Sequence, residues 1–145
     1  MRYYYIKKNK KTRRDGGYDM KFKHKLAKFF GKHAETRDDH VDPTLITRYY
    51  NTTKTRGMKT LEELFSGSEV YKVNSISEDH GEISLLKRKG KKAFIIMTVI
   101  MVRPSKTAVD FAVTTETLLP FDFGYSSRLI QDLYEQVNKK LYKVD

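Results

Sequence analysis

The sequence predicts an α+β fold, a two-layer sandwich in which a four-stranded antiparallel meander sheet is flanked by two helices. Three observations predict it. Residues 69–117 contain four strand-like segments, and short polar turns join them. A segment with helical spacing of its apolar residues precedes these strands, and another follows them. Connections this short join antiparallel neighbours, so the predicted order of elements is α-β-β-β-β-α.

Composition limits the classes of protein that this chain can represent. Its 145 residues suit one domain, and 29 Lys and Arg against 18 Asp and Glu give a net charge of +11. Because cysteine is absent, disulfides, thiolate catalysis and cysteine zinc sites are excluded. The longest apolar run, residues 93–102, is shorter than the roughly 20 residues that span a bilayer. The N-terminus does not resemble a secretory signal peptide, so we expect a cytoplasmic protein.

The excess positive charge lies at the start of the chain. Residues 1–19 hold seven basic and two acidic side chains, residues 20–33 hold five Lys and no acidic side chain, and residues 34–145 hold 17 basic and 16 acidic side chains. We therefore expect a basic disordered arm, a basic amphipathic segment and a single α+β domain, with a basic N-terminal extension ahead of the domain. Any codons for Gly16 and Gly17 are purine-rich, so translation from Met20 is an alternative to translation from Met1.

Helical spacing separates two kinds of side chain in residues 20–33. The basic stripe is Lys21, Lys25, Lys28 and Lys32, and the apolar stripe is Phe22, Leu26 and Phe29. Such a segment can pack on the protein's own core, lie on an anionic membrane surface at the inner face of the membrane, or contact RNA or the ribosome. A helix this short is marginal alone, so we expect membrane binding to be weak and sensitive to salt.

The first helix of the domain follows a polar linker in residues 34–54. Thr52 or Thr53 can cap it. Its apolar residues recur at spacings of three and four: Met58, Leu61, Leu64 and Phe65. Gly67 follows Ser66 at its end.

The four predicted strands are residues 69–76, 82–88, 92–103 and 107–117. Residues 93–102 are apolar on both faces, whereas the other strands mostly alternate. A second layer must cover the additional apolar face. Residues 20–50 or a second copy of the chain can do so, and a homodimer is therefore an expected partner.

The last helix is predicted for residues 126–142. Ser126 or Ser127 can cap it. An apolar stripe at four-residue spacing faces the sheet: Leu129, Leu133, Val137 and Leu141.

An aromatic loop at residues 118–125 precedes this helix and has two interpretations. It closes the end of the sandwich as an apolar plug, or it forms one wall of a ligand pocket between helix and sheet. The pocket residues would be Phe121, Phe123 and Tyr125 on one side and Tyr49, Tyr50 and Tyr71 on the other. No particular small-molecule partner follows from this pattern.

A second group of basic residues lies in the predicted turn between the second and third strands. It consists of Lys87, Arg88, Lys89, Lys91 and Lys92. Such a turn keeps a sheet edge soluble, or it contacts phosphate or lipid headgroups. Gly90 is not part of a phosphate-binding loop, because the earlier glycine is missing and no helix follows.

The chain carries no recognisable catalytic or metal-binding signature. Asp38, Asp39, His40 and Asp42 lie close together, but their spacing matches no standard metal loop. The adjacent carboxylates Glu62 and Glu63 point apart on a helix, and those at 78–79 lie in a turn. We therefore predict no metal, no cofactor and no enzymatic activity, and a cytoplasmic binding domain instead. The alternative is a small-ligand-binding or enzymatic site in the pocket between helices and sheet.

The segments HAETRDDHVDPTLITRYY and HGEISLLKRKGKKAFIIMTVIMVRPSKTAVDFAVTTETLLPFDFGYS resemble the uncharacterised small cytosolic proteins of bacilli. The resemblance covers about residues 33–142. The order of elements and a His-x-x-Pro at His40–Pro43 are more distantly similar to a domain-of-unknown-function family of short bacterial and plastid proteins. The nearer resemblance implies a bacterial cytoplasmic protein without an assigned activity, and it transfers no site residue. Lipid-binding sandwiches of the polyketide-cyclase type have more strands than the four expected here.

Overall fold

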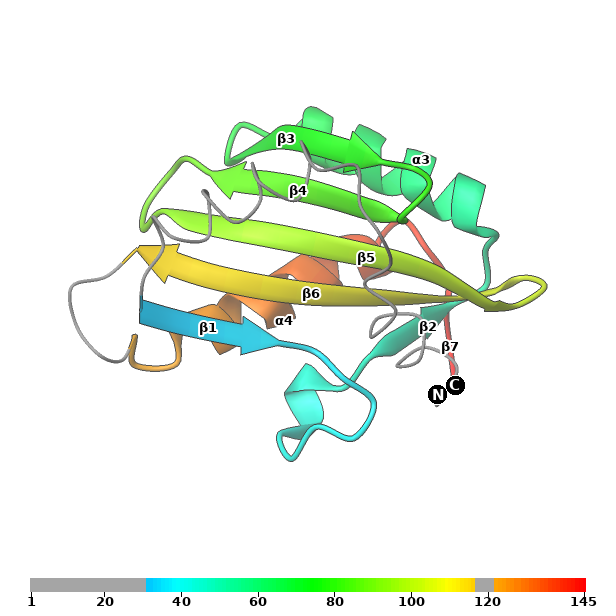
Figure 1. Ribbon diagram of the computed structural model, residues 1–145, viewed down its shortest axis with the longest axis horizontal. Helices are drawn as coiled ribbons and strands as arrows, with labels where there is room; N and C mark the ends of the chain where they lie inside the picture. Colours follow the sequence, from blue (N-terminus) through cyan, green and yellow to red (C-terminus); the bar gives the residue numbers. More distant parts are fainter. Residues whose placement is uncertain (1–30, 117–121) are drawn as a thin grey trace.

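The computed structural model describes residues 31–116 and 122–145. Its described elements form an antiparallel sheet with two α-helices on one side (Figure 1). In chain order they are β1 (Gly31–Glu35), the 3-10 helix η1 (Pro43–Leu45), β2 (Arg48–Tyr50), α3 (Lys54–Ser66), β3 (Tyr71–Ser77), β4 (Glu82–Lys87), β5 (Ala93–Arg103), β6 (Lys106–Glu116), α4 (Tyr125–Asn138) and β7 (Lys143–Val144).

The described sheet has seven strands, so the predicted four-stranded sheet is wrong, although the α+β class fits. The strand order is β3-β4-β5-β6-β2-β7, and β1 also pairs with β6. The meander β3 to β6 is present, but it is part of a larger sheet. Strands β1 and β2 lie end to end along the far side of β6, since β1 pairs with its second half and β2 with its first half.

The three additional strands are short and lack the alternation that predicts a strand. β2 has three residues and β7 has two, and β1 has the sequence GKHAE. They are strands because the long edge of β6 offers backbone partners, and such tertiary context overrides weak local preference. Gly31, which lies within the predicted amphipathic segment of residues 20–33, begins β1. The number of strands therefore no longer separates this chain from lipid-binding sandwiches of the polyketide-cyclase type.

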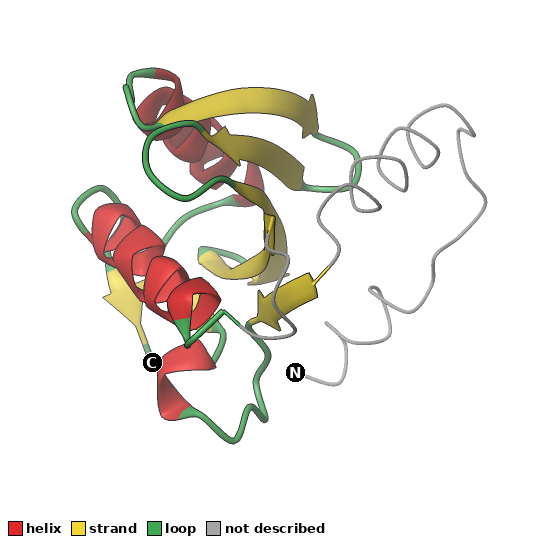
Figure 2. Ribbon diagram, turned by 90° about the vertical axis from the view of Figure 1, so that its left-hand side faces the viewer, coloured by secondary structure: helices red, strands yellow, loops and turns green. Residues whose placement is uncertain are grey.

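Both described α-helices pack on the same face of the sheet (Figure 2). Thr53 caps α3, because its side chain accepts a hydrogen bond from the backbone N–H of Arg56 at 3.2 Å. α4 begins differently from the prediction: its N-cap is Gly124, and neither predicted serine caps it. No helix in the described ranges is long and apolar enough to cross a membrane.

The main core lies between the helices and the sheet. β5 contributes Ile95, Met97 and Val99 to it, and α4 contributes Leu133. Phe94 lies on the opposite face of β5, as strand alternation requires. β5 therefore has apolar residues on both faces. β1 and β2, which belong to the segment expected to cover the second face, instead join the edge of the sheet.

Between β1 and β2 the chain leaves β6 and returns to it, and a buried carboxyl group lies at this gap. Asp110 on β6 is 2% exposed. Its Oδ1 accepts hydrogen bonds from the hydroxyls of Thr36, where the chain leaves, and Thr47, where it returns, at 2.5 and 2.8 Å. Its Oδ2 is buried without a hydrogen-bond partner in the described structure. We call Asp110, Thr36 and Thr47 the Asp110 cluster.

Candidate functional site

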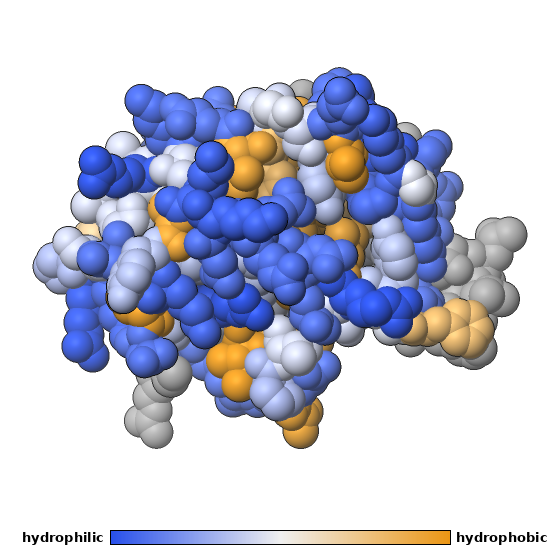
Figure 3. Space-filling model, turned by 180° about the vertical axis from the view of Figure 1, so that it is seen from behind, coloured by the Kyte–Doolittle hydropathy of each residue, from blue (hydrophilic) through white to orange (hydrophobic). Residues whose placement is uncertain are grey.

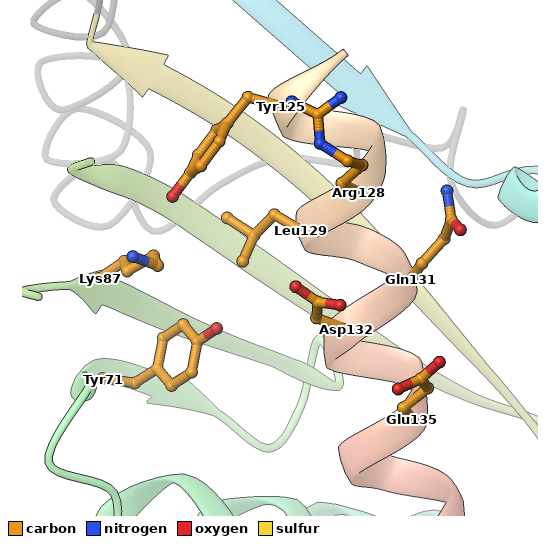
Figure 4. Close-up of a pocket in the computed structure, with 8 residues that line it drawn as sticks. All are labelled: Tyr71, Lys87, Tyr125, Arg128, Leu129, Gln131, Asp132 and Glu135. Carbon is orange, nitrogen blue, oxygen red and sulfur yellow. The ribbon is translucent and has the colours of Figure 1, made fainter. Parts of the chain in front are cut away.

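A cleft of about 480 Å³ lies between α4 and the adjoining ends of β3 and β4 (Figure 4). This volume falls within the range of about 300–1,000 Å³ that is common for small-ligand sites. The cleft is lined by Tyr71, Lys87, Tyr125, Arg128, Leu129, Gln131, Asp132 and Glu135. Six of these residues lie on α4, so this helix forms one wall, and Tyr71 and Lys87 form the other (Figure 4).

The floor of the cleft is apolar and buried. Leu129 and Tyr71 are 4% and 6% exposed. Burial raises the pKa of the Tyr71 phenol, partly offset by a hydrogen bond with Gln136, so the group is neutral at physiological pH. Seen from the helix side, the surface is mostly hydrophilic, and apolar residues show in places between the hydrophilic ones (Figure 3). Because the floor of the cleft is apolar, a ligand can bury apolar surface there while its polar groups reach the rim.

Tyr125 connects this wall to the hairpin between β4 and β5. Its hydroxyl donates to the backbone oxygen of Lys91 at 3.1 Å. The Lys91 ammonium lies 4.9 Å from the centroid of the Tyr125 ring, and that of Lys87 lies 6.0 Å from it, within the range of cation–π contacts. Lys87 also donates to the backbone oxygens of Lys89 and Lys91, which fixes its ammonium at the turn. The cleft thus has a cationic end beside an aromatic ring.

Charge changes sign along the cleft. Arg128 lies one turn into α4, close to Tyr125, and its Nη1 donates to the backbone oxygen of Phe123 at 3.0 Å. Asp132 and Glu135 follow about one and two turns further along the same face. In Figure 4 the Asp132 carboxylate points toward the strands that carry Tyr71. The cleft therefore has a cationic end and an acidic end, and it can orient a ligand by charge.

Asp122 fixes the start of α4 and with it the position of Tyr125. Its carboxylate accepts hydrogen bonds from the backbone N–H groups of Gly124 and Ser126, at 3.1 and 3.0 Å, and from the Ser126 hydroxyl. Burial acts to raise the pKa of Asp122, but the hydrogen bonds from Ser126 and Gly124 outweigh it and lower that pKa below its usual value. The carboxylate is therefore ionised at the positive end of the helix, where it is stabilising.

The residues expected to wall a pocket lie in different places. Tyr125 and Tyr71 line the cleft, and Phe123 is exposed next to it. Tyr49 and Tyr50 lie on β2, outside the cleft lining. The Tyr49 hydroxyl donates to Asp38 at 2.6 Å, and the buried Tyr50 hydroxyl is hydrogen-bonded to the side-chain amide of Asn138 at 2.7 Å. Phe121 lies outside the described residues.

The basic residues expected to bind anionic surfaces fall into two groups. In the hairpin, Lys87 lines the cleft, and Arg88, Lys89 and Lys92 are exposed. Lys89 pairs with Glu69 at 2.8 Å. For the amphipathic segment, the backbone of Lys32 lies in β1, and the remaining predicted residues lie outside the described part of the chain: Lys21, Phe22, Lys25, Leu26, Lys28 and Phe29.

The acidic segment that was considered as a metal loop forms local turns instead. Asp42 caps η1, since its Oδ1 accepts hydrogen bonds from the N–H and hydroxyl of Thr44 at 2.9 and 2.7 Å. These hydrogen bonds lower the pKa of Asp42. The backbone N–H of Asp42 donates to Nδ1 of His40 at 2.9 Å. Within residues 31–116 and 122–145, no group of three His, Asp or Glu side chains is placed to hold a metal ion.

The polar side chains of α4 that line the cleft were not predicted from the sequence. They are Arg128, Gln131, Asp132 and Glu135. Their spacing of three and four residues beside the apolar stripe places them on one flank of the helix. That spacing is visible in the sequence, but an exposed flank of this kind is usually only a solvated surface. This flank of α4 differs from a solvated surface because Tyr71 lies opposite it, and only the three-dimensional structure shows that position.

Comparison with known protein families finds no matching family model, and no curated protein matches the chain. The solved structures similar to it include the following two. TTHA0849 from Thermus thermophilus has 12% identity and a TM-score of 0.43, over 75% of this chain and 93% of that one. The Zhui aromatase/cyclase from Streptomyces sp. R1128 has 9% identity and a TM-score of 0.40, over 74% of this chain and 84% of that one.

Proposed function

We propose that this protein binds a small anionic amphiphile in the cleft between α4 and the ends of β3 and β4. The observation that carries the proposal is the arrangement around Tyr125. The ring of Tyr125 adjoins the buried apolar floor of the cleft, and the cationic groups of Lys87, Lys91 and Arg128 lie near this ring. A carboxylate or sulfonate group would lie among these cations, and the apolar part of the ligand would contact Leu129 and the aromatic rings.

The acidic end of the cleft restricts the ligand further. A second anionic group near Asp132 and Glu135 would be repelled, whereas a hydroxyl or amino group could donate to them. These side chains are exposed, so water screens their effect and each contributes a modest factor to affinity. The favoured ligand therefore has one anionic end, an apolar middle part, and at most a hydrogen-bond donor at its other end.

The proposal can be tested with dodecanoate as a probe. Titration of the ¹⁵N-labelled protein below the probe's micelle concentration should give saturable shifts at residues lining the cleft. Arg128→Met should weaken binding about three- to tenfold, whereas Arg128→Lys, which keeps the charge, should weaken it less. Arg56→Met on α3, which removes an exposed cation from the other helix, is the matched control and should leave affinity unchanged.

A substitution that is expected to strengthen binding makes the test more specific. Asp132→Asn removes a negative charge from the cleft, so it should strengthen dodecanoate binding about twofold at low salt. Dodecanol, which lacks the carboxylate, should not respond to Arg128→Met. The proposal is wrong if shifts are spread over the whole surface, or if Arg128→Met and Arg56→Met have the same effect.

A further inference from the structure

The end of the molecule next to the cleft joins a basic hairpin to an exposed aromatic residue. The turn between β4 and β5 and the start of α4 lie together at the left of Figure 1. The bond from Tyr125 to the backbone of Lys91 connects the two segments. We define the basic end as Phe123, Arg128 and the hairpin residues Lys87, Arg88, Lys89, Lys91 and Lys92.

Phe123 is exposed and has a disfavoured backbone conformation. The residue is 71% exposed, and its φ of 56° lies in the left-handed region, which a residue with a Cβ rarely adopts. Gly124 follows with a φ of 76°. The hydrogen bonds from Gly124 to Asp122 and from Arg128 to the Phe123 oxygen hold this turn. Strain kept at an exposed apolar residue points to a role for its position.

Cations outnumber acidic groups at this end. Glu69 pairs with Lys89, Glu116 ends β6 beside the start of β5, and the Asp122 carboxylate lies at the start of α4. Against these three carboxylates, the five hairpin cations and Arg128 supply six positive charges. β1 also begins at this end, since Gly31 pairs with Glu116. The positive field is therefore concentrated around Phe123 and the mouth of the cleft.

We propose that the basic end docks on an anionic phospholipid bilayer. Phe123 enters the interface between headgroups and acyl chains, and the hairpin cations and Arg128 contact the headgroups. The charge complementarity is that of a polybasic surface to anionic lipid. RNA is a poorer match, because single-stranded RNA is bound by several aromatic rings that stack successive bases, whereas among the described residues this end exposes one large aromatic side chain, Phe123.

Docking in this orientation would place the cleft beside the bilayer. That part of the inference rests on the proposed function, since it identifies the anionic amphiphile as one that the membrane supplies. The docking itself does not rest on it. Dodecanoate binding measured without vesicles tests the cleft, and vesicle binding measured without added amphiphile tests the basic end, so failure of one is distinguishable from failure of the other.

Vesicle co-sedimentation of the full chain is the first test. The protein should pellet with vesicles of phosphatidylcholine and phosphatidylglycerol and much less with phosphatidylcholine alone. Reversing two exposed hairpin charges, with Arg88→Glu and Lys92→Glu together, should reduce the partition coefficient about tenfold or more. Phe123→Ser should reduce it about threefold or more. The matched controls are Lys140→Glu at the far end of α4 and Val41→Ser, a 90% exposed apolar residue.

A tryptophan at position 123 reports on the contact directly, because the chain has no other tryptophan. With Phe123→Trp, emission should shift to the blue on addition of anionic vesicles, and brominated acyl chains should quench it. The docking surface is disproved if the protein pellets while this emission stays unchanged, if the controls lose as much binding as the basic-end variants, or if RNA binds the same surface and anionic lipid does not. Unchanged thermal unfolding of each variant excludes misfolding as the cause.

Discussion

The buried carboxyl group of Asp110 should make the protein less stable as the pH rises above about 4. Burial raises the pKa of Asp110 well above its ordinary value in the folded chain, whereas in the unfolded chain the pKa is about 3.9. Between these two values the folded carboxyl is protonated and the unfolded one is ionised. Unfolding then releases a proton, so a higher pH favours unfolding.

The size of the effect follows from one proton per molecule. The free energy of unfolding should fall by about 1.4 kcal/mol for each pH unit, or about 2.8 kcal/mol over two units, as long as the folded carboxyl stays protonated. Asp42 and Asp122 act in another range. Their pKa values are lowered in the folded state, so the stability they contribute is present above about pH 3.9 and is lost only as the pH falls below it.

Asp110→Asn isolates this contribution, because the amide does not ionise. Urea unfolding of both proteins should be measured from about pH 4.5 to 7.5, and the difference between them is the quantity of interest. The wild type should be the more stable at the acidic limit, and its advantage should decrease with pH at the slope given above. Asp79→Asn, at an exposed site in the turn after β3, is the matched control. A difference that does not change with pH would refute this account of Asp110.

Two further predictions concern packing and backbone conformation. Leu133→Ala on α4 removes a fully buried side chain and should lower the free energy of unfolding by about 2–5 kcal/mol, measured in urea; a loss below about 1 kcal/mol would mean that α4 is not packed as described. Gly81→Ala places a Cβ 2.2 Å from the backbone oxygen of Val99 at a φ of 67°, so we expect a loss of about 2 kcal/mol or more in thermal unfolding. Gly67→Ala has its nearest contact at 3.6 Å and should change stability by less than about 1 kcal/mol; equal effects at the two glycines would contradict the reasoning.

The elements that the sequence predicted are those with a pattern that extends over several residues. β6 alternates over 11 residues, β5 is an apolar run of similar length, and α3 and α4 have 13 and 14 residues with an apolar stripe. β1, β2 and β7 are too short for a period to be recognised, and their pairing partners are distant in sequence. Gly31, for example, pairs with Glu116. Contacts at such separation leave no local pattern.

Asp110 is an example of a contact between distant residues that leaves a partial signal in the sequence. It is a charged residue between Ala108 and Ala112 on one face of β6, the face away from the main core. Its partners Thr36 and Thr47 are more than 60 residues away, and nothing near them in the sequence indicates that they meet. An isolated acidic residue in an otherwise apolar strand therefore predicts a buried partner, but not which residues supply it.

The cleft could be predicted only in part for a similar reason. Tyr71 and Tyr125 were predicted as pocket residues because they are aromatic side chains next to turns, whereas Lys87 was predicted only as part of a basic turn. Their combination depends on the start of α4. Asp122 holds this helix end, and the Tyr125 hydroxyl bonds to the hairpin backbone, so the helix and the hairpin keep a fixed relative position. The same two contacts place the exposed Phe123 beside the cleft, which is why a surface that binds lipid and a cleft that binds an amphiphile would operate as one site.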